Sequence, residues 1–205
     1  MIKAEEALAR LKQGNERFVA GVRSVETIIK QNNRADLVNC QDPFAIILGC
    51  SDSRVPAELV FDQGLGDLFV IRVAGNIVAP SQVGSIEFAV EQFGTPLVVV
   101  LGHTMCGAIT AAISEAEKPI KGQSENVLSI VNRIRPHVEP LLLTDLKNKP
   151  EELLSASIRA NILASTNSLR HGSQLLEKYL QSGKLKIIGA EYCLETGEVE
   201  FFDDI

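Results

Sequence analysis

Three residues of the chain, Cys50, His103 and Cys106, have the side chains that proteins use to bind transition metals. Cys50 directly follows the apolar run 45–49, and His103 directly follows the apolar run 97–102. Cys106 comes three residues after His103, a spacing that lets both side chains reach one point across a helical turn. Two thiolates and one imidazole leave one coordination position open, which is typical of a catalytic rather than a structural zinc site.

A carboxylate and a guanidinium follow the first thiol. In an extended stretch, side chains at alternate positions share a face, so Cys50, Asp52 and Arg54 are expected to point the same way. Arg54 can then hold the Asp52 carboxylate by paired hydrogen bonds. Each of these residues alone would be interpreted as a buried thiol or as part of a surface ion pair. Together with a second ligand pair they indicate a catalytic metal site.

Two strand–helix units must bring these residues together. Residues 45–49 and 97–102 are apolar and rich in β-branched side chains, which is typical of buried strands. Helices are predicted after each of them, over residues 55–60 with Pro56 in the first turn and over 107–113. The carboxyl ends of parallel strands lie at one edge of a sheet, where open α/β sheets place their sites. The fold class is therefore predicted to be α/β, with a mostly parallel central sheet covered by helices.

Further elements are predicted from periodicity and turn residues. Strands are expected at 68–74 and 184–194, with an additional short antiparallel strand at 198–202 near the C-terminus. Helices are expected at 1–21, from a cap at Ser81 through Val90, from 124 onward and at 151–171. No internal repeat or domain boundary interrupts residues 1–205, so a single domain is expected.

Composition narrows the class of protein. The net charge is −6 and no basic run occurs, so nucleic-acid binding is disfavoured. No apolar run approaches the length of a membrane span, and the acidic amphipathic start is unlike a signal peptide, so a cytoplasmic protein without membrane contact is predicted. Four cysteines in such a chain favour metal binding or free thiols over disulfides. Cys40 and Cys193 are then spare thiols outside the proposed site.

Five spaced motifs together resemble the β-class carbonic anhydrases. They are the segments 14–18, 50–54 (CSDSR), 67–76 (DLFVIRVAGN), 84–90 and 102–107 (GHTMCG). The resemblance implies one Zn²⁺ per chain on Cys50, His103 and Cys106, and reversible hydration of CO₂ to bicarbonate and a proton by zinc-bound hydroxide. It also implies a homodimer or a multiple of dimers. The first helix, 1–21, would then cover either its own domain or a neighbouring subunit.

The resemblance also supplies candidates for the substrate pocket. Gln41 matches a glutamine whose amide meets the substrate, and the amide of Gly107 is a further possible donor. Phe69 and Ala74 match apolar wall positions, although many relatives have valine in place of Ala74. Phe88 stands where many relatives have tyrosine, so any role of that hydroxyl is missing here.

Asp52 and Arg54 match a pair that controls the site in the family. With Arg54 holding Asp52 away from zinc, water takes the fourth position, whereas an Asp52 released from Arg54 becomes a conditional fourth ligand. Some relatives also have a noncatalytic bicarbonate site that includes a tryptophan three residues before the first cysteine. Ile47 occupies that position, and the chain has no Trp. Inhibition by bicarbonate bound at such a noncatalytic site is therefore not expected.

Two other functions remain open at the level of sequence. The same three-ligand site could hydrolyse a CO₂ analogue such as carbon disulfide or carbonyl sulfide. A zinc-stabilised structural or interaction protein would need four protein ligands and would lose its fold without the metal. The three ligands and the charged pair beside them favour an enzyme.

Overall fold

The computed structural model describes residues 2–32, 37–38, 41–118 and 122–202. Its centre is a five-stranded sheet with the order β2-β1-β3-β4-β5. The strands are β1 (Ala45–Gly49), β2 (Leu68–Arg72), β3 (Leu97–His103), β4 (Lys186–Tyr192) and β5 (Val199–Phe202). The first four strands are mutually parallel and β5 is antiparallel to β4. The predicted α/β fold with an added C-terminal strand is thus confirmed.

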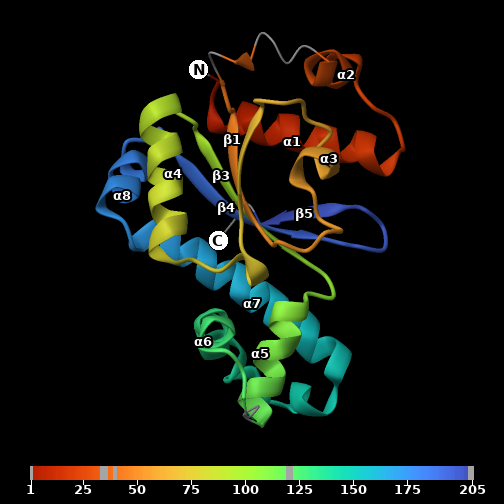
Figure 1. The fold of residues 1–205 in the computed structure, drawn as a ribbon, viewed down its shortest axis with the longest axis vertical. Coiled ribbons are helices and arrows are strands. Elements are labelled where there is room, and N and C mark those ends of the chain that lie inside the picture. The colour runs from red at the N-terminus through yellow and green to blue at the C-terminus, as the bar shows by residue number, and fades with distance from the viewer. Residues whose placement is uncertain (1, 33–36, 39–40, 119–121, 203–205) are drawn as a thin grey trace.

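Helices cover both faces of the sheet (Figure 1). They are α1 (Ala4–Val19), α2 (Val25–Asn32), α3 (Ala57–Val60), α4 (Pro80–Phe93), α5 (Gly107–Glu117), α6 (Glu125–Val138), α7 (Pro150–His171) and α8 (Gln174–Gln181). Short 3₁₀ turns occur at η2 (Ala74–Asn76), η3 (Leu141–Leu143) and η4 (Asp145–Asn148). Helices α5 and α6 extend away from the sheet beyond α7, at the bottom of Figure 1. None of the helices in the described ranges has the length and apolar character needed to cross a bilayer.

Two apolar cores lie on the two faces of the sheet. Alternate residues of the strands point to opposite faces, and all residues of β1 and β3 are buried. One core packs α4 to α8 against residues such as Leu48 and Val100. The other packs α1 and α3 against residues such as Ile47 and Val99. Burial on both faces explains why these strands are continuously apolar in the sequence.

Helix α1 covers its own chain. Its residues Ala7, Leu8 and Leu11 are buried in the core that also contains β1 and β3. The Asn15 amide fastens the helix further, because it donates to the carbonyls of Val60 and Gly197. Of the two alternatives for this helix, the structure shows the first, in which the helix covers its own domain. Contact between α1 and a neighbouring subunit stays a prediction.

Some local expectations differ from the structure. Ser81 does not cap α4, because the N-cap is Ala79 and the Ser81 hydroxyl donates to Gln82 in the first turn. Pro56 is itself the N-cap of α3, one position before the helix. The short helices α2 and α8 were not predicted, since eight residues carry too little periodicity to be recognised. Cys40 lies outside the described residues.

Candidate metal centre

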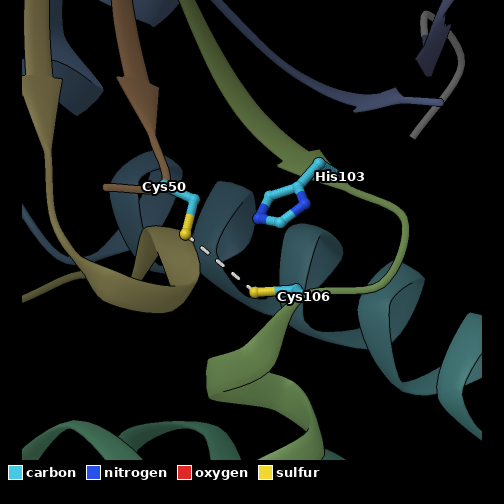
Figure 2. A group of neighbouring side chains, drawn as sticks. All are labelled: Cys50, His103 and Cys106. Carbon is cyan, nitrogen blue, oxygen red and sulfur yellow. Dashed lines mark hydrogen bonds between the residues drawn. The ribbon is translucent and has the colours of Figure 1, made fainter. Parts of the chain in front are cut away.

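The structure brings Cys50, His103 and Cys106 together at the carboxyl edge of the sheet. One ligand atom from each of the three lies within 4.8 Å of the others. The three residues come from the ends of β1 and β3 and from the start of α5, and their side chains converge on one space (Figure 2). All three are buried, with exposed fractions of 5%, 0% and 1%.

Strand pairing explains how the first two ligands meet. In the parallel register of β1 and β3, Gly49 lies beside Leu101, so Cys50 follows level with Gly102 and next to His103. The absence of a side chain at Gly102 lets α7 pack closely against β3, because a Cβ at that position would lie 2.5 Å from two side-chain carbons of Ile162. Residues 53 positions apart in sequence thus reach one edge through the register of two buried strands.

The third ligand reaches the site through a turn rather than within a helix. The sequence spacing suggested that His103 and Cys106 share a helical turn. Instead His103 ends β3, Met105 adopts a left-handed conformation with φ of 57°, and Cys106 is the N-cap of α5. A positive φ is unfavourable for a residue with a side chain, so the surrounding structure must hold this turn.

Thr104 orients the His103 ring. The Nδ1 atom of His103 lies 2.8 Å from the Thr104 carbonyl oxygen, which can only accept, so we assign the proton to Nδ1. A neutral imidazole then presents the Nε2 lone pair to the site. Two hydrogen bonds fix Thr104 to the end of β4. Its amide donates to the Tyr192 carbonyl, and its hydroxyl accepts from the amide of Leu194, which follows the strand.

The two thiols form a hydrogen-bonded pair, with their sulfur atoms 4.0 Å apart. Donation from Cys106 is the main reason why the pKa of Cys50 is lowered to about 4. The same bond and burial raise the pKa of Cys106, although the Ile109 and Ala108 amides at the start of α5 act in the opposite direction. Burial alone would lower the pKa of His103, but its interaction with Cys50 and its bond to Thr104 raise it.

Asp52 and Arg54 form a closely bonded pair beside the three ligands. The guanidinium donates from Nε and Nη2 to the two carboxylate oxygens at 2.9 and 2.8 Å, and the Arg54 amide donates to Asp52 Oδ1 at 3.0 Å. These bonds hold the pKa of Asp52 well below its usual range. Asp52 Oδ2 lies 3.9 Å from His103 Nε2. The pair therefore stands at the edge of the ligand cluster.

The local backbone around this pair differs from the extended stretch that was expected. The Val55 amide donates to the Asp52 carbonyl at 3.0 Å, which closes a turn. Arg72, expected from the sequence as a buried or paired residue of the strand at 68–74, stabilises the turn by donating to the carbonyls of Cys50 and Asp52 at 3.0 and 2.6 Å. The position of Arg72 at the end of the strand beside β1 was the sequence feature that could have indicated its contact with this turn.

The pocket candidates fall into two groups. Ala74 and Gly107 lie directly beside the centre. Ala74 precedes Gly75, whose amide donates to Cys50, and Gly107 directly follows Cys106. Gln41 is exposed and precedes β1, at the opposite end of that strand from Cys50. Phe69 and Phe88 pack together at the β2–α4 edge, with ring centroids 6.4 Å apart. Within a single chain, Gln41, Phe69 and Phe88 therefore lie away from the three ligands.

The donor set fits a zinc ion. Two thiolates and one imidazole are ligands that zinc prefers, and they are buried together. Two ligand sulfurs at zinc-bonding distance in a tetrahedral site stand about 3.8 Å apart, close to the 4.0 Å found here. The Nε2 atom of His103 is buried and makes no hydrogen bond within the described residues. An orphaned buried nitrogen that faces two thiols is well suited to a metal ion.

Comparisons with known proteins place the chain in one family. A family model described as carbonic anhydrase matches residues 45–199. Carbonic anhydrase 2 of Mycobacterium tuberculosis is 39% identical over 196 residues, which cover 95% of this chain and 91% of that protein. The carbonic anhydrase of Mycolicibacterium smegmatis is 39% identical over 193 residues, covering 93% and 89%.

Solved structures extend the similarity to the fold. The β-carbonic anhydrase CcaA superposes with a TM-score of 0.72 at 26% identity, covering 98% of this chain and 93% of that one. A tetrameric β-carbonic anhydrase of Sordaria macrospora gives a TM-score of 0.73 at 22% identity, covering 86% and 89%. At 22% identity, the similarity to the Sordaria macrospora structure is one of fold alone.

Proposed function

The chain belongs to the β-class carbonic anhydrases, and from this premise we propose that it catalyses the reversible hydration of CO₂ to bicarbonate and a proton on a zinc ion. The observation that carries the proposal is the convergence of the two thiols and one imidazole, which leaves one coordination position free. A zinc ion held there would supply a Lewis acid that makes hydroxide available near neutral pH.

The chain's own residues would prepare this reaction in three ways. Cys50 and Cys106 would bind the metal as thiolates, and the amides at the start of α5 favour the charged form of Cys106. His103 would bind through Nε2, since its Nδ1 proton is held by the Thr104 carbonyl. Burial of all three ligands keeps bulk water away from the metal and strengthens the electrostatic interactions inside the site.

Asp52 and Arg54 would control access to the free position. Arg54 holds the carboxylate by two side-chain hydrogen bonds, which keeps Asp52 directed away from the metal and able to accept a hydrogen bond from the attacking water. Without these bonds the carboxylate, already 3.9 Å from His103 Nε2, could become a fourth ligand. CO₂ is small and apolar, so its binding needs little more than a dry pocket, for which Ala74 and the Gly107 amide are the nearest candidates.

We expect the purified, zinc-loaded protein to hydrate CO₂ rapidly in a stopped-flow assay, with one zinc per chain by metal analysis. Carbon disulfide, offered to the same preparation, should be turned over far more slowly. Removal of the metal by a chelator should abolish hydration, and added zinc should restore it. Turnover of carbon disulfide without CO₂ hydration would instead assign the site to a CO₂ analogue. Retained CO₂ hydration after complete zinc removal would contradict the proposed mechanism.

We also propose that the chain assembles as a homodimer or a multiple of dimers. The edge formed by β2 and α4 supports this, because Phe88 is 53% exposed there and packs on Phe69 and Phe93. Gln41 lies beyond the far end of β1, so a role for its amide in the pocket would require a second copy of the chain. The free thiols Cys50, Cys106 and Cys193 suit a reducing compartment, and we propose a cytoplasmic location.

A charge on this edge is expected to break the assembly. Phe88→Glu should shift sedimentation toward the monomer, because the carboxylate would have to be buried without a partner. Leu143→Glu is the matched control, since Leu143 is an equally apolar residue, 89% exposed, on η3. An unchanged oligomer in Phe88→Glu would exclude this edge, and a wild-type chain that sediments as a fully active monomer would end the proposal of a dimer.

A further inference from the structure

Asn161 is a buried polar residue of α7 that lies outside every motif of the sequence. It is 2% exposed, and its Nδ2 atom donates to the carbonyl oxygen of Gly75 at 2.8 Å. The two residues are 86 positions apart, so the contact exists only in the folded chain. A buried amide bonded to a main-chain carbonyl fixes both groups, because neither can exchange the partner for water.

Gly75 in turn touches the metal centre. Its amide nitrogen lies 3.4 Å from Cys50 Sγ and donates to it. Gly75 and Asn76 are both left-handed, with φ of 70° and 42°. A side chain at position 75 would be strained, because φ is positive there and a Cβ would lie 2.8 Å from Ile134 Cδ1 and 3.1 Å from Ala108 Cβ. The residue that donates to the thiol therefore sits in a tight turn with no side chain of its own to anchor it.

This turn depends on hydrogen bonds to hold its shape. A left-handed conformation at Asn76 is unfavourable, so it persists only where the surroundings hold it. The Asn76 amide donates to the Val73 carbonyl at 3.1 Å, which closes the turn from within. Asn161 holds the Gly75 carbonyl from outside, and thereby links the long helix α7 to the backbone that faces Cys50.

We propose that Asn161 is a positioning residue of the metal centre: by holding the Gly75 carbonyl it keeps the Gly75 amide aimed at the Cys50 sulfur. The inference rests on the proposed function, because it takes Cys50 to be a metal ligand. Asn161 touches neither metal nor substrate and acts through Gly75. Outer hydrogen bonds of this kind orient ligands and tune their donor strength.

Two variants test the role of the Asn161 amide. Asn161→Asp keeps the size of the side chain but replaces the donor with a carboxylate that repels the Gly75 carbonyl. Asn161→Leu keeps the branched shape and the number of side-chain heavy atoms without a polar group, and it carries the test if the buried charge of Asn161→Asp prevents folding. Both are expected to lower zinc affinity, measured by competition with a chelator, by about 10–100-fold.

A spectroscopic measurement separates positioning from general loosening. In the Co²⁺-loaded variants the thiolate-to-metal charge-transfer band should move to lower energy, because a thiolate that loses a hydrogen bond donates electrons more readily. Ser157→Ala is the matched control: Ser157 lies one turn earlier on α7, is 0% exposed, and its hydroxyl has no hydrogen-bond partner among the described residues. It should leave zinc affinity and the band as in the wild type.

The outcomes keep the two proposals apart. A wild-type protein that shows no thiolate band with Co²⁺ and no zinc binding would overturn the proposed function itself. If the wild type binds metal and folded Asn161 variants match it in affinity and band energy, only the role of Asn161 is overturned. Equal effects from Ser157→Ala would also overturn it, because they would reflect loosening of α7. Lower affinity with a shifted band in the Asn161 variants alone is the supporting result.

Discussion

Cys106→Ser is expected to remove most of the zinc and to abolish CO₂ hydration. The serine oxygen is a harder and more weakly donating ligand than a thiolate, and zinc favours the softer sulfur. Cys106 is 1% exposed, and its sulfur lies 4.0 Å from that of Cys50, so the substitution removes one of the two thiols of the buried cluster. Zinc content after dialysis, measured beside the hydration rate, gives the result.

Cys193→Ser is the matched control for this change. Cys193 is a free thiol just after β4, outside the cluster of three ligands. Its replacement should leave both zinc content and hydration close to wild type. Full zinc occupancy in Cys106→Ser would remove Cys106 from the ligand set, whereas metal loss in Cys193→Ser would require a different assignment of the ligands.

Arg54→Ala and Asp52→Asn are expected to keep zinc but to lower kcat steeply. Loss of the guanidinium frees the Asp52 carboxylate to occupy the position that the attacking water needs, and we expect a fall of about 10–100-fold, as for other residues that orient a metal site. Asp52→Asn removes the carboxylate that accepts a hydrogen bond from the attacking water and orients it, and a positioned acceptor typically contributes about 10²–10⁴-fold. Both rates must be measured at matched zinc content.

An ordinary ion pair would behave differently. Arg135→Ala removes an exposed arginine–carboxylate pair away from the site, with Arg135 Nε 2.8 Å from Glu139 Oε1 on α6, and should leave kcat unchanged. If Arg54→Ala and Asp52→Asn also retain kcat near the wild-type value, the pair has only a structural role and the gating proposal fails. Exposed pairs contribute little to stability, so reduced folding is not the expected explanation for lost activity.

The pH dependence follows from the direction of the Asp52 shift. Arg54 holds the pKa of Asp52 well below its usual range, so the carboxylate stays ionised from about pH 5 upward. The stability that this depressed pKa contributes is present above the usual pKa and is lost only in acid, as pH falls through the lowered value. An increase in hydration rate between pH 6 and 9, as expected for an attacking hydroxide, therefore does not come from Asp52. A rate that stays flat over this range would contradict that expectation.

Local sequence patterns were enough to predict the fold class and to bring the three candidate ligands to one edge of the sheet. The runs 45–49 and 97–103 are buried on both faces of the sheet, and such strands stand out in a sequence as continuous apolar segments. A ligand directly after such a strand must lie at the carboxyl edge, whatever the strand order. This is why Cys50 and His103 could be placed near each other before their register was known.

Tertiary structure decided how the site is supported. The left-handed turn at Met105, the bonds of Arg72 to the Cys50 and Asp52 carbonyls, and the contact of Asn161 with Gly75 depend on long-range packing. Gln41, in contrast, precedes β1 and Cys50 follows it, so the strand predicted at 45–49 already places these two residues at opposite ends. A sequence pattern reports the period and burial of one element, whereas these contacts depend on how elements distant in sequence meet in space.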